Sequence, residues 1–343
     1  MKTAIIFGAT GQDGSYLSEF LISKDYFVVG VARRVSTTNT QRINHLLSNS
    51  NFLLAEGDIT DPHSVNNILN TYKDSVEVYN LAAQSHVGTS FKQPATTWDI
   101  TGKGCLNILE SIRLINPEMR FYQASSSEMF GDKHTISHFG DKFQYEETPF
   151  NPQSPYAIAK LAAHHATCLY KKSYGLHASC GILYNHESPR RGENFVTRKI
   201  TKYIADLVTS QEEIAPLKLG NLYAKRDWGY AGDYVEAMWA MLQQDDPDVY
   251  VIATGETYSV EEFLSEAFSC VDINDYSKHV EIDSSLIRPS EVPFLKGDYS
   301  KAEETFGWRP KTSFEDLVSI MVKHDIDRVK RHDSVNLKQR ASL

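Results

Sequence analysis

Tyr156 and Lys160 are the two residues of this sequence whose types and spacing most clearly indicate chemistry. They are four residues apart, so on a helix their side chains share one face. A free tyrosine has a pKa of about 10, which is too high for a base at neutral pH. A neighbouring ammonium group favours the phenolate and lowers that pKa. The spacing therefore predicts that Tyr156 transfers protons and that Lys160 lowers the pKa of Tyr156.

A second reactive group, Ser125 to Glu128, follows a predicted strand at 120–124. A hydroxyl here, such as that of Ser126, can share a proton with Tyr156 and a substrate. Glu128 is more informative, because an enzyme that only moves hydride to an alcohol carbon needs no carboxylate beside its tyrosine. One that removes a carbon-bound proton next to a carbonyl does need it. The alternative for Glu128 is a surface carboxylate or a cap at the strand end.

A glycine turn precedes these residues in the chain. Gly8, Gly11 and Gly14 follow an apolar strand at 4–7 and open a predicted helix at 14–24. In that context glycines let the backbone approach a pyrophosphate, and the helix N-terminus supplies donors and partial positive charge. The turn predicts a bound dinucleotide, whose nicotinamide ribose Lys160 would hold and whose positive ring would further favour the Tyr156 phenolate. The alternative is a turn with only a structural role.

Two arginines after the second predicted strand indicate which dinucleotide binds. An NAD enzyme carries an acid there for the ribose 2′-hydroxyl, whereas this chain has Arg33 and Arg34. Guanidinium groups favour a 2′-phosphate, so NADP is predicted over NAD, with a solvated charge pair as the alternative. Asp58, after the third strand, is placed to meet the adenine ring or to cap a helix.

Short β-branched runs alternate with amphipathic stretches through the first half of the chain. This alternation predicts an α/β fold, a Rossmann-type doubly wound parallel sheet with helices on both faces. The predicted strands are 4–7, 27–31, 52–56, 76–80, 120–124, 178–183 and 249–252. The predicted helices are 14–24, 61–72, 100–115, 155–173 and 233–242.

After residue 184 the pattern becomes irregular, which predicts a smaller, mostly C-terminal α/β lobe that binds the substrate. We expect the NADP-binding domain to span 1–184, with a return at 228–254. The substrate lobe would then comprise 185–227 and 255–328. The polar segment 329–343 is expected to form a loose tail.

Composition excludes several classes of protein. The chain has 343 residues, 41% apolar, with a formal charge of −9, which argues against nucleic-acid or membrane-surface partners. No apolar run reaches the ~18 residues needed to cross a bilayer, and the start is too short for a secretory signal. The four cysteines show no metal-ligand spacing, so no metal is predicted. Free cysteines in a reducing compartment indicate a cytoplasmic protein.

Longer strings resemble the extended short-chain dehydrogenase/reductase family, and within it the GDP-mannose 4,6-dehydratases. The strings are Gly11–Tyr16, Asn80–His86, Gln123–Gly131, Asn185–Gly192, Phe195–Ile200 and Lys225–Gly229, and the match covers about residues 3–325. The resemblance implies NADP-dependent conversion of GDP-mannose to GDP-4-dehydro-6-deoxy-mannose. Tyr156 would take the C4 hydroxyl proton, Ser126 would hydrogen-bond at C4, and Glu128 would remove the C5 hydrogen. The cofactor would take hydride from C4 and return it to C6.

The resemblance also implies binding residues. The catalytic set is Ser126, Glu128, Tyr156 and Lys160. The cofactor contacts are Gly8, Gly11, Gln12, Asp13, Gly14, Arg33, Arg34, Ser36, Asp58, Leu81, Ser85, Tyr156, Lys160, His186 and Arg191. The GDP-sugar contacts are Ser85, Ser126, Asn185, Glu187, Lys199, Arg226, Arg288 and Glu291. Without the resemblance, His186 would be interpreted as a core histidine and the arginines as surface charges.

The same resemblance implies a homo-oligomer. Residues 33–42 resemble a loop that reaches a neighbouring subunit's cofactor, and helices 100–115 and 155–173 resemble a dimerising pair, so a dimer or tetramer is expected. Two other functions stay open. One is a nucleotide-sugar 4-reductase or 4-epimerase, also built on Tyr156 and Lys160. The other is a non-catalytic NADP-sensing protein.

Overall fold

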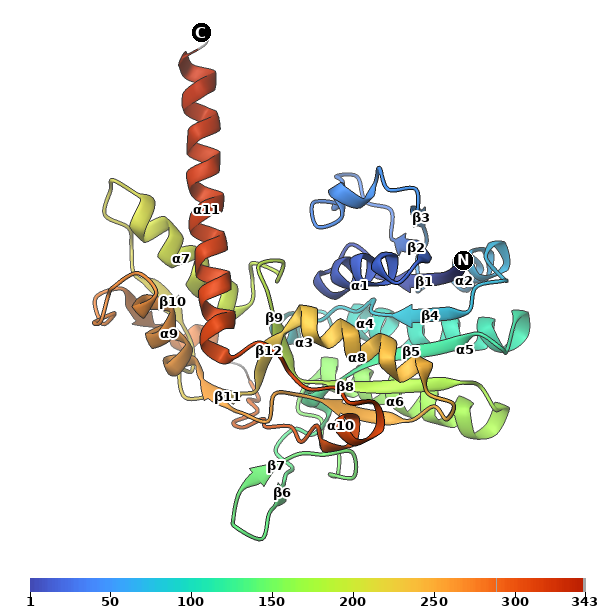
Figure 1. Cartoon of the computed structure of the whole chain (residues 1–343). Coiled ribbons are helices and arrows are strands. Elements are labelled where there is room, and N and C mark those ends of the chain that lie inside the picture. The colour runs from blue at the N-terminus through green and yellow to red at the C-terminus, as the bar shows by residue number, and fades with distance from the viewer. Residues whose placement is uncertain (288, 342–343) are drawn as a thin grey trace.

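Seven parallel strands form the central sheet in this computed structural model, which describes residues 1–287 and 289–341 (Figure 1). Their order is β13-β8-β5-β4-β1-β2-β3. The strands are β1 (Lys2–Phe7), β2 (Tyr26–Ala32), β3 (Phe52–Glu56), β4 (Glu77–Asn80), β5 (Arg120–Ser126), β8 (Ala178–Leu183) and β13 (Val249–Ile252). The predicted Rossmann-type parallel sheet is confirmed, and each of its strands overlaps a strand expected from the sequence.

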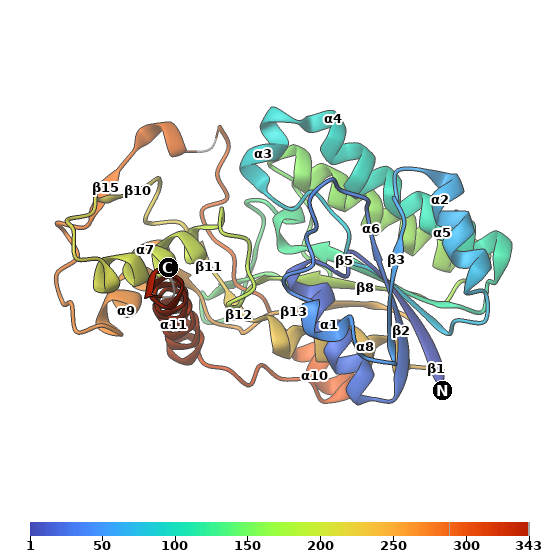
Figure 2. The same ribbon diagram turned by 90° about the horizontal axis from the view of Figure 1, so that it is seen from above.

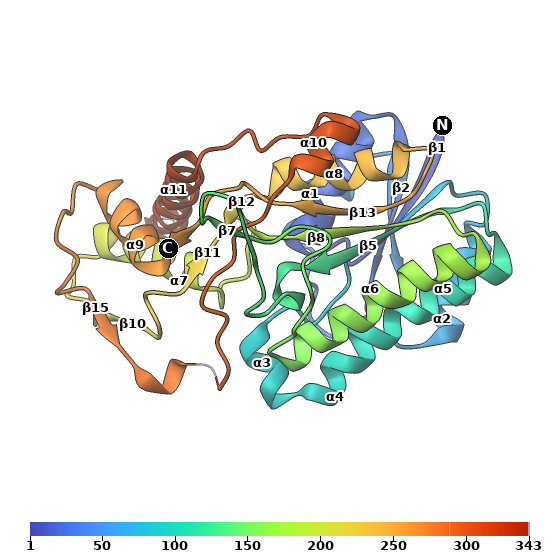
Figure 3. The same cartoon turned by 90° about the horizontal axis from the view of Figure 1, so that it is seen from below.

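Helices cover both faces of the sheet, as Figures 2 and 3 show from opposite sides. One face carries α1 (Gln12–Ser23), α8 (Ala231–Gln243) and α10 (Ser300–Phe306). The other carries α2 (Pro62–Thr71), α5 (Gly104–Ile115) and α6 (Pro155–Tyr174).

Strand β1 shows why its buried part, residues 4–7, is apolar throughout. Ala4 and Ile6 belong to the core beneath α1 and α8, whereas Ile5 and Phe7 belong to the core beneath α2, α5 and α6. Successive side chains of a strand point to opposite faces, so a strand buried on both sides needs no polar position.

A second group of elements lies beside the carboxyl ends of the strands (Figures 1 and 2). Its core lies between α7 (Val196–Thr209), α9 (Val260–Ser269) and α11 (Phe314–Ala341). A buried ion pair between Arg198 of α7 and Asp325 of α11, 2.8 Å apart, joins two of these helices. Paired short strands complete it: β9 (Asn185–Glu187) with β12 (Trp228–Tyr230), β10 (Leu217–Leu219) with β15 (Val280–Ile282), and β11 (Lys225–Arg226) with β14 (Tyr258–Ser259).

Two segments differ from expectation. The helix expected from residue 100 begins as a π-helical segment, η2 (Trp98–Lys103), and continues as α5. Helix α11 runs through Ala341, where the sequence indicated a loose tail over 329–343. No glycine or proline follows Pro310, and Lys, Arg, Gln and Leu are good helix formers, so polar composition here accompanies a helix.

The remaining elements are short. They are η1 (Asn44–Leu46), α3 (Val87–Lys92), α4 (Pro94–Thr97), η3 (Ser127–Met129), β6 (Thr135–Ile136), β7 (Lys142–Phe143) and η4 (Ser284–Leu286). Across residues 1–287 and 289–341, no helix combines the length and apolar character required to cross a bilayer.

The strand order reverses between β1 and β4, because β2 and β3 extend the sheet on one side and β5, β8 and β13 on the other. Ligands of open α/β sheets bind in the crevice at such a switch point. The glycine turn follows β1 directly, and Leu81 follows β4, so both lie at this position.

Candidate active site

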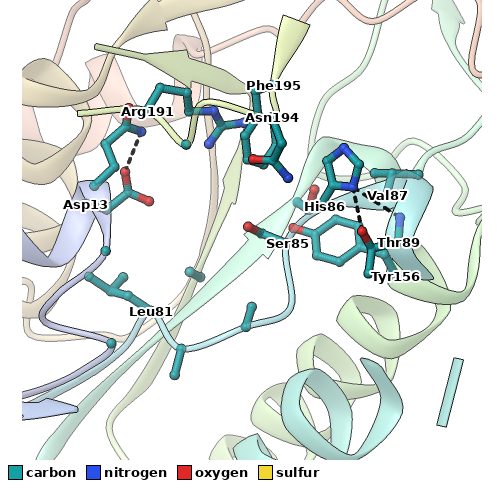
Figure 4. Close-up of a pocket in the computed structure, with 18 of the residues that line it drawn as sticks. Asp13, Leu81, Ser85, His86, Val87, Thr89, Tyr156, Arg191, Asn194 and Phe195 are labelled. Carbon is teal, nitrogen blue, oxygen red and sulfur yellow. Dashed lines mark hydrogen bonds between the residues drawn. The ribbon is translucent and has the colours of Figure 1, made fainter. Parts of the chain in front are cut away.

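A cavity of about 1310 Å³ lies at the carboxyl ends of the strands and extends toward α7 and β10. The residues that follow β1, β2, β4, β5 and β8 all line it, so the sheet itself brings the predicted cofactor and catalytic residues together. Figure 4 shows Asp13 and Arg191 toward one side of the part drawn and Thr89 and Tyr156 toward the other, with Ser85 between them.

The glycine turn is shaped by close backbone approach. Gly8 has a φ of +90°, and a Cβ on it would lie 2.9 Å from the backbone nitrogen of Ala82. A Cβ on Gly14 would lie 2.3 Å from the carbonyl oxygen of Gly8. Helix α1 begins after Gly11 without a side-chain cap, so its first N–H groups are left for a ligand.

Tyr156 and Lys160 are positioned by the start of α6. Ser154 caps this helix, its Oγ accepting a hydrogen bond from the Ala157 N–H at 3.1 Å, and Pro155 occupies the first helical position. The Lys160 Nζ donates to the carbonyl oxygen of Ala124 in β5 at 2.6 Å and lies 5.9 Å from the centre of the Tyr156 ring. One helix face therefore presents both groups to the end of β5.

The pKa of Tyr156 differs from the expectation. Burial raises it to about 12, and although the hydrogen bond with Ser126 lowers it, the Glu128 carboxylate raises it further. Lys160 was expected to lower this pKa, but its ammonium is directed to Ala124 and is itself desolvated, with its pKa lowered to about 8. The protein alone thus holds Tyr156 as a neutral phenol.

Ser126 and Glu128 lie beside the phenol. Ser126 ends β5, and its Oγ accepts a hydrogen bond from the Glu128 N–H at 3.3 Å, which opens the turn η3. Glu128 is 9% exposed and lines the cavity, so it is not a surface carboxylate. Within residues 1–287 and 289–341 its carboxylate accepts no hydrogen bond, which leaves it available to a ligand.

Gln12 and Asp13 connect the glycine turn to β9. The Gln12 Nε2 donates to the His186 carbonyl oxygen at 3.0 Å, and the Ser188 hydroxyl donates to the Gln12 Oε1 at 2.8 Å. The Asp13 carboxylate pairs with the His186 ring at 2.9 Å. The Gln12 amide and the Asp13 carboxylate, both predicted cofactor ligands, are therefore already hydrogen-bonded to the protein, and both residues still line the cavity.

The residues expected near the adenosine end lie apart from the phenol. Arg33 and Arg34 follow β2, are exposed and line the cavity, whereas Ser36 lies outside its lining. Asp58 lines the cavity, but its Oδ1 also accepts hydrogen bonds from the Thr60 N–H at 2.9 Å and hydroxyl at 2.8 Å. The helix cap proposed as the alternative is not at Asp58, because Asp61 caps α2 by accepting a hydrogen bond from the His63 N–H at 3.0 Å. Contact of Asp58 with adenine stays a prediction.

The residues expected to bind the sugar nucleotide form pairs. Arg226 donates to the Glu291 carboxylate at 2.8 Å, and Glu187 accepts from the Thr197 hydroxyl at 2.5 Å while pairing with Arg191 at 3.2 Å. Arg288 lies outside the described residues. The other predicted cofactor and sugar contacts that line the cavity are Gly11, Leu81, Ser85, Asn185 and Lys199.

Several lining residues were missed by the sequence analysis. The His86 Nδ1 lies 2.8 Å from the Thr89 Oγ1, and its ring packs edge-on against Phe195 at 5.5 Å (Figure 4). The Arg191 guanidinium lies 3.7 Å from the centre of the Phe195 ring. His86, Phe195 and Asn194 lie in or beside the strings that resemble the dehydratase family. The resemblance therefore pointed to these segments of the chain but gave the three residues no role.

Comparisons with known proteins agree with this geometry. The sequence profile described as GDP-mannose 4,6 dehydratase matches residues 5–321. GDP-mannose 4,6 dehydratase 1 of Arabidopsis thaliana is 50% identical over 340 residues, covering 96% of this chain and 91% of that protein. UDP-glucuronic acid 4-epimerase from Bacillus cereus, solved with UDP-glucuronic acid and NAD, has a TM-score of 0.81 at 23% identity and covers 95% and 99% of the two chains. RMD from Pseudomonas aeruginosa, complexed with NADPH, has a TM-score of 0.76 at 20% identity and covers 96% and 100%.

The parallel sheet, the glycine turn at its switch point and the Tyr156–Lys160 face of α6 define a Rossmann-type enzyme of the extended short-chain dehydrogenase/reductase class. The profile match and the 50% identity over nearly the whole chain narrow this class. The chain belongs to the GDP-mannose 4,6-dehydratase family.

Proposed function

We propose that this protein dehydrates GDP-mannose to GDP-4-dehydro-6-deoxy-mannose, with NADP as a retained cofactor. The observation that carries the proposal is the meeting of a phenol, a hydroxyl and a carboxylate at the end of β5. The residues are Tyr156, Ser126 and Glu128. A 4-reductase or 4-epimerase has no use for the Glu128 carboxylate, and the Arabidopsis relative is named for the dehydratase reaction.

The part of the cavity at the ends of β1 and β2 suits a dinucleotide. Cβ atoms on Gly8 and Gly14 would collide with backbone, so these positions keep the turn tight enough for a pyrophosphate to approach the α1 N-terminus. Arg33 and Arg34 supply two guanidinium groups where NAD enzymes carry an acid, which supports a 2′-phosphate. Bound NADP⁺ would supply the acceptor for the C4 hydrogen, store it for C6 and add positive charge beside Tyr156.

Tyr156 and Ser126 act at C4. Their hydrogen bond joins the phenol to a hydroxyl that can hold the substrate's C4 oxygen, so the C4 hydroxyl proton can pass to Tyr156 as the C4 carbonyl forms. Lys160 fixes this geometry through its bond to the Ala124 carbonyl and supplies positive charge when protonated.

Glu128 acts at C5 and C6. A C4 carbonyl acidifies the C5 hydrogen, and the Glu128 carboxylate, which no protein donor engages within the described residues, can accept that proton. The same carboxyl can then return a proton to the C6 hydroxyl, which leaves as water. Proton removal and water loss thus balance on one side chain.

The part of the cavity that extends toward α7 and β10 suits the GDP-sugar. Lys199 and Arg226 bring positive charge to it, and the planar guanidinium group of Arg226 matches a diphosphate. Arg226 and Glu291 form an ion pair in which both side chains are largely buried. Without its partner, either one would be an unpaired charge with little access to water, so the pair holds Arg226 in place.

The test is incubation of the purified protein with GDP-mannose and no added reductant, followed by detection of the 4-keto product and of water loss by mass. We expect a product lighter by one water at multiple turnovers per enzyme. Absence of the 4-keto product, or a stoichiometric requirement for NADPH, would reject the dehydratase activity.

We also propose a homo-oligomer joined through η2, α5 and α6. These segments carry large apolar side chains that are at least 44% exposed, which is typical of an interaction surface. They are Trp98, Leu106, Leu114, Ile158, Leu169 and Tyr174. Light scattering should give a dimer or tetramer for the native chain and a smaller species for Leu114→Lys with Leu169→Lys.

A further inference from the structure

Three metal-ligand side chains meet on the side of β5 that faces α6, outside the proposed catalytic group. They are His164 and Cys168 of α6 and Cys180 of β8, and their ligand atoms all lie within 4.8 Å of one another. The His164 Nε2 is 3.9 Å from the Cys168 Sγ, and the Cys180 Sγ is 3.9 Å from the His164 carbonyl oxygen. Tetrahedral zinc with bonds of about 2.0 Å to nitrogen and about 2.3 Å to sulfur needs ligands about 3.5–3.8 Å apart. Small side-chain rotations reach that spacing.

The histidine is oriented for this role. Its Nδ1 lies 3.0 Å from the Ser125 hydroxyl, and its Nε2 faces the sulfur of Cys168. When Nδ1–H donates to Ser125 Oγ, the Nε2 lone pair is directed toward the two thiols. Metal-binding histidines almost always have such a partner on the second nitrogen, because it fixes the tautomer and the ring plane.

Charge and access also suit a divalent ion. Two thiolates and a neutral imidazole give a dication a site of zero net charge, which is the arrangement that burial tolerates. His164 is 4% exposed and Cys180 1%, while Cys168 is only partly buried and leaves an entry side. Soft thiolate ligands select zinc-type ions over magnesium or calcium.

We infer that His164, Cys168 and Cys180 bind one Zn²⁺ ion, with a water in the fourth position on the Cys168 side. Binding forms one Zn–N and two Zn–S bonds and releases the two thiol protons to solvent, so no oxidant or reductant is required. The ion would join α6 to β8 directly behind the catalytic end of β5. This inference does not depend on the proposed dehydratase activity.

No metal was predicted from the sequence, because the four cysteines lack the close spacing of metal-ligand motifs. Here two ligands lie one helical turn apart on α6, and the third comes from a neighbouring strand twelve residues later. Only the packing of α6 on β8 brings them together.

The test uses Co²⁺ as a spectroscopic substitute for Zn²⁺ on the reduced, chelator-treated full chain. We expect one Co²⁺ per chain, with a thiolate-to-cobalt charge-transfer band and intense visible bands typical of tetrahedral coordination, and loss of both on adding Zn²⁺. Cys168→Ser and Cys180→Ala should abolish the charge-transfer band or reduce it to that of a single thiolate. Cys270→Ser is the matched control, because Cys270 is exposed and outside the cluster, and it should leave the spectrum unchanged.

A further variant tests the orientation of the histidine. Ser125→Ala should weaken Zn²⁺ binding about 10- to 100-fold while keeping the thiolate band at saturating Co²⁺. The inference fails if the folded wild-type chain shows no thiolate-to-cobalt band. Position 168 is partly exposed, so Cys168→Ser is expected to fold, and the inference also fails if this variant keeps the band intact. It fails as well if the mass of the native chain is lower by two hydrogens because Cys168 and Cys180 form a disulfide.

Discussion

Asp13, in the first turn of α1, and His186, in β9, form an ion pair with 2.9 Å between the carboxylate Oδ2 and the imidazole Nε2. The other ring nitrogen lies 2.7 Å from the carbonyl oxygen of Tyr184. Both nitrogens face acceptors, and only the imidazolium can donate to both. The pair thus holds the glycine turn against β9, and both line the cavity.

Stability should depend on pH through this pair. Burial raises the pKa of Asp13 and lowers that of His186, but mutual attraction outweighs both effects, so the Asp13 pKa falls from 3.8 to about 2 and the His186 pKa rises above 6.5. By linkage, the Asp13 contribution is present above pH 3.8 and lost as pH falls toward 2. The His186 contribution is complete below pH 6.5 and lost as pH rises through its raised pKa.

We therefore expect His186→Gln to lower the free energy of unfolding by about 2 kcal/mol at mildly acidic pH, and by less once His186 loses its charge. Urea unfolding across a pH series measures this. The exposed His63 offers a control, since His63→Gln should change stability by no more than about 0.5 kcal/mol. A His186→Gln effect that stays constant with pH would show that His186 is neutral in the native protein.

Glu128→Gln should separate the two halves of the proposed reaction. The amide cannot accept the C5 proton, so dehydration should fall about 10²- to 10⁴-fold while oxidation at C4 survives. The measurement is deuterium exchange from solvent into C5, together with cofactor absorbance after mixing with GDP-mannose. Glu118→Gln, a change at an exposed carboxylate before β5, should leave both unchanged. Persistent C5 exchange in Glu128→Gln would identify another base.

Lys160 should set an upper pH limit for kcat/KM. Its burial lowers its pKa to about 8, so above that pH the free enzyme loses the Lys160 ammonium, which we propose holds the nicotinamide ribose beside Tyr156. We expect kcat/KM to fall tenfold per pH unit above about 8 in the wild type, and Lys160→Arg to be slower but to lack this decline. Tyr156→Phe should lose turnover while still binding GDP-mannose. An unchanged decline in Lys160→Arg would assign it to another group.

The sequence was sufficient for features that depend on local spacing. The glycine turn, the Tyr156–Lys160 face and the polar strand end at Ser126 each follow from a few adjacent residues, and the sheet places them together. It was insufficient where partners are distant in the chain, as for Asp13 with His186, Arg226 with Glu291, and Cys180 with His164. The direction of the Tyr156 pKa was also missed, because burial depends on the complete fold.

Arg33 and Arg34 should decide cofactor preference. Replacing both with alanine removes the guanidinium partners of a 2′-phosphate but none needed by NAD, so the preference for NADP over NAD should fall by about 10- to 100-fold. Fluorescence titration with NADPH and NADH measures the ratio directly. Lys24→Ala, a change at an exposed cation outside the cavity lining, is the control. An unaltered ratio in the double variant would mean that the arginines are only a solvated pair.

Gly14→Ala should damage both stability and cofactor binding. The added Cβ would lie 2.3 Å from the Gly8 carbonyl oxygen and 2.6 Å from the Ala9 Cα, and neither backbone atom can move without opening the turn. We expect a loss of about 1–3 kcal/mol in unfolding free energy and at least tenfold weaker NADPH binding. Gly102→Ala is the matched control. Its Cβ would lie at an ordinary 3.5 Å from the Ala159 carbonyl oxygen of α6 and from the Trp98 ring, and the variant should bind NADPH normally. Equal losses in the two variants would show that close approach at Gly14 does not shape the turn.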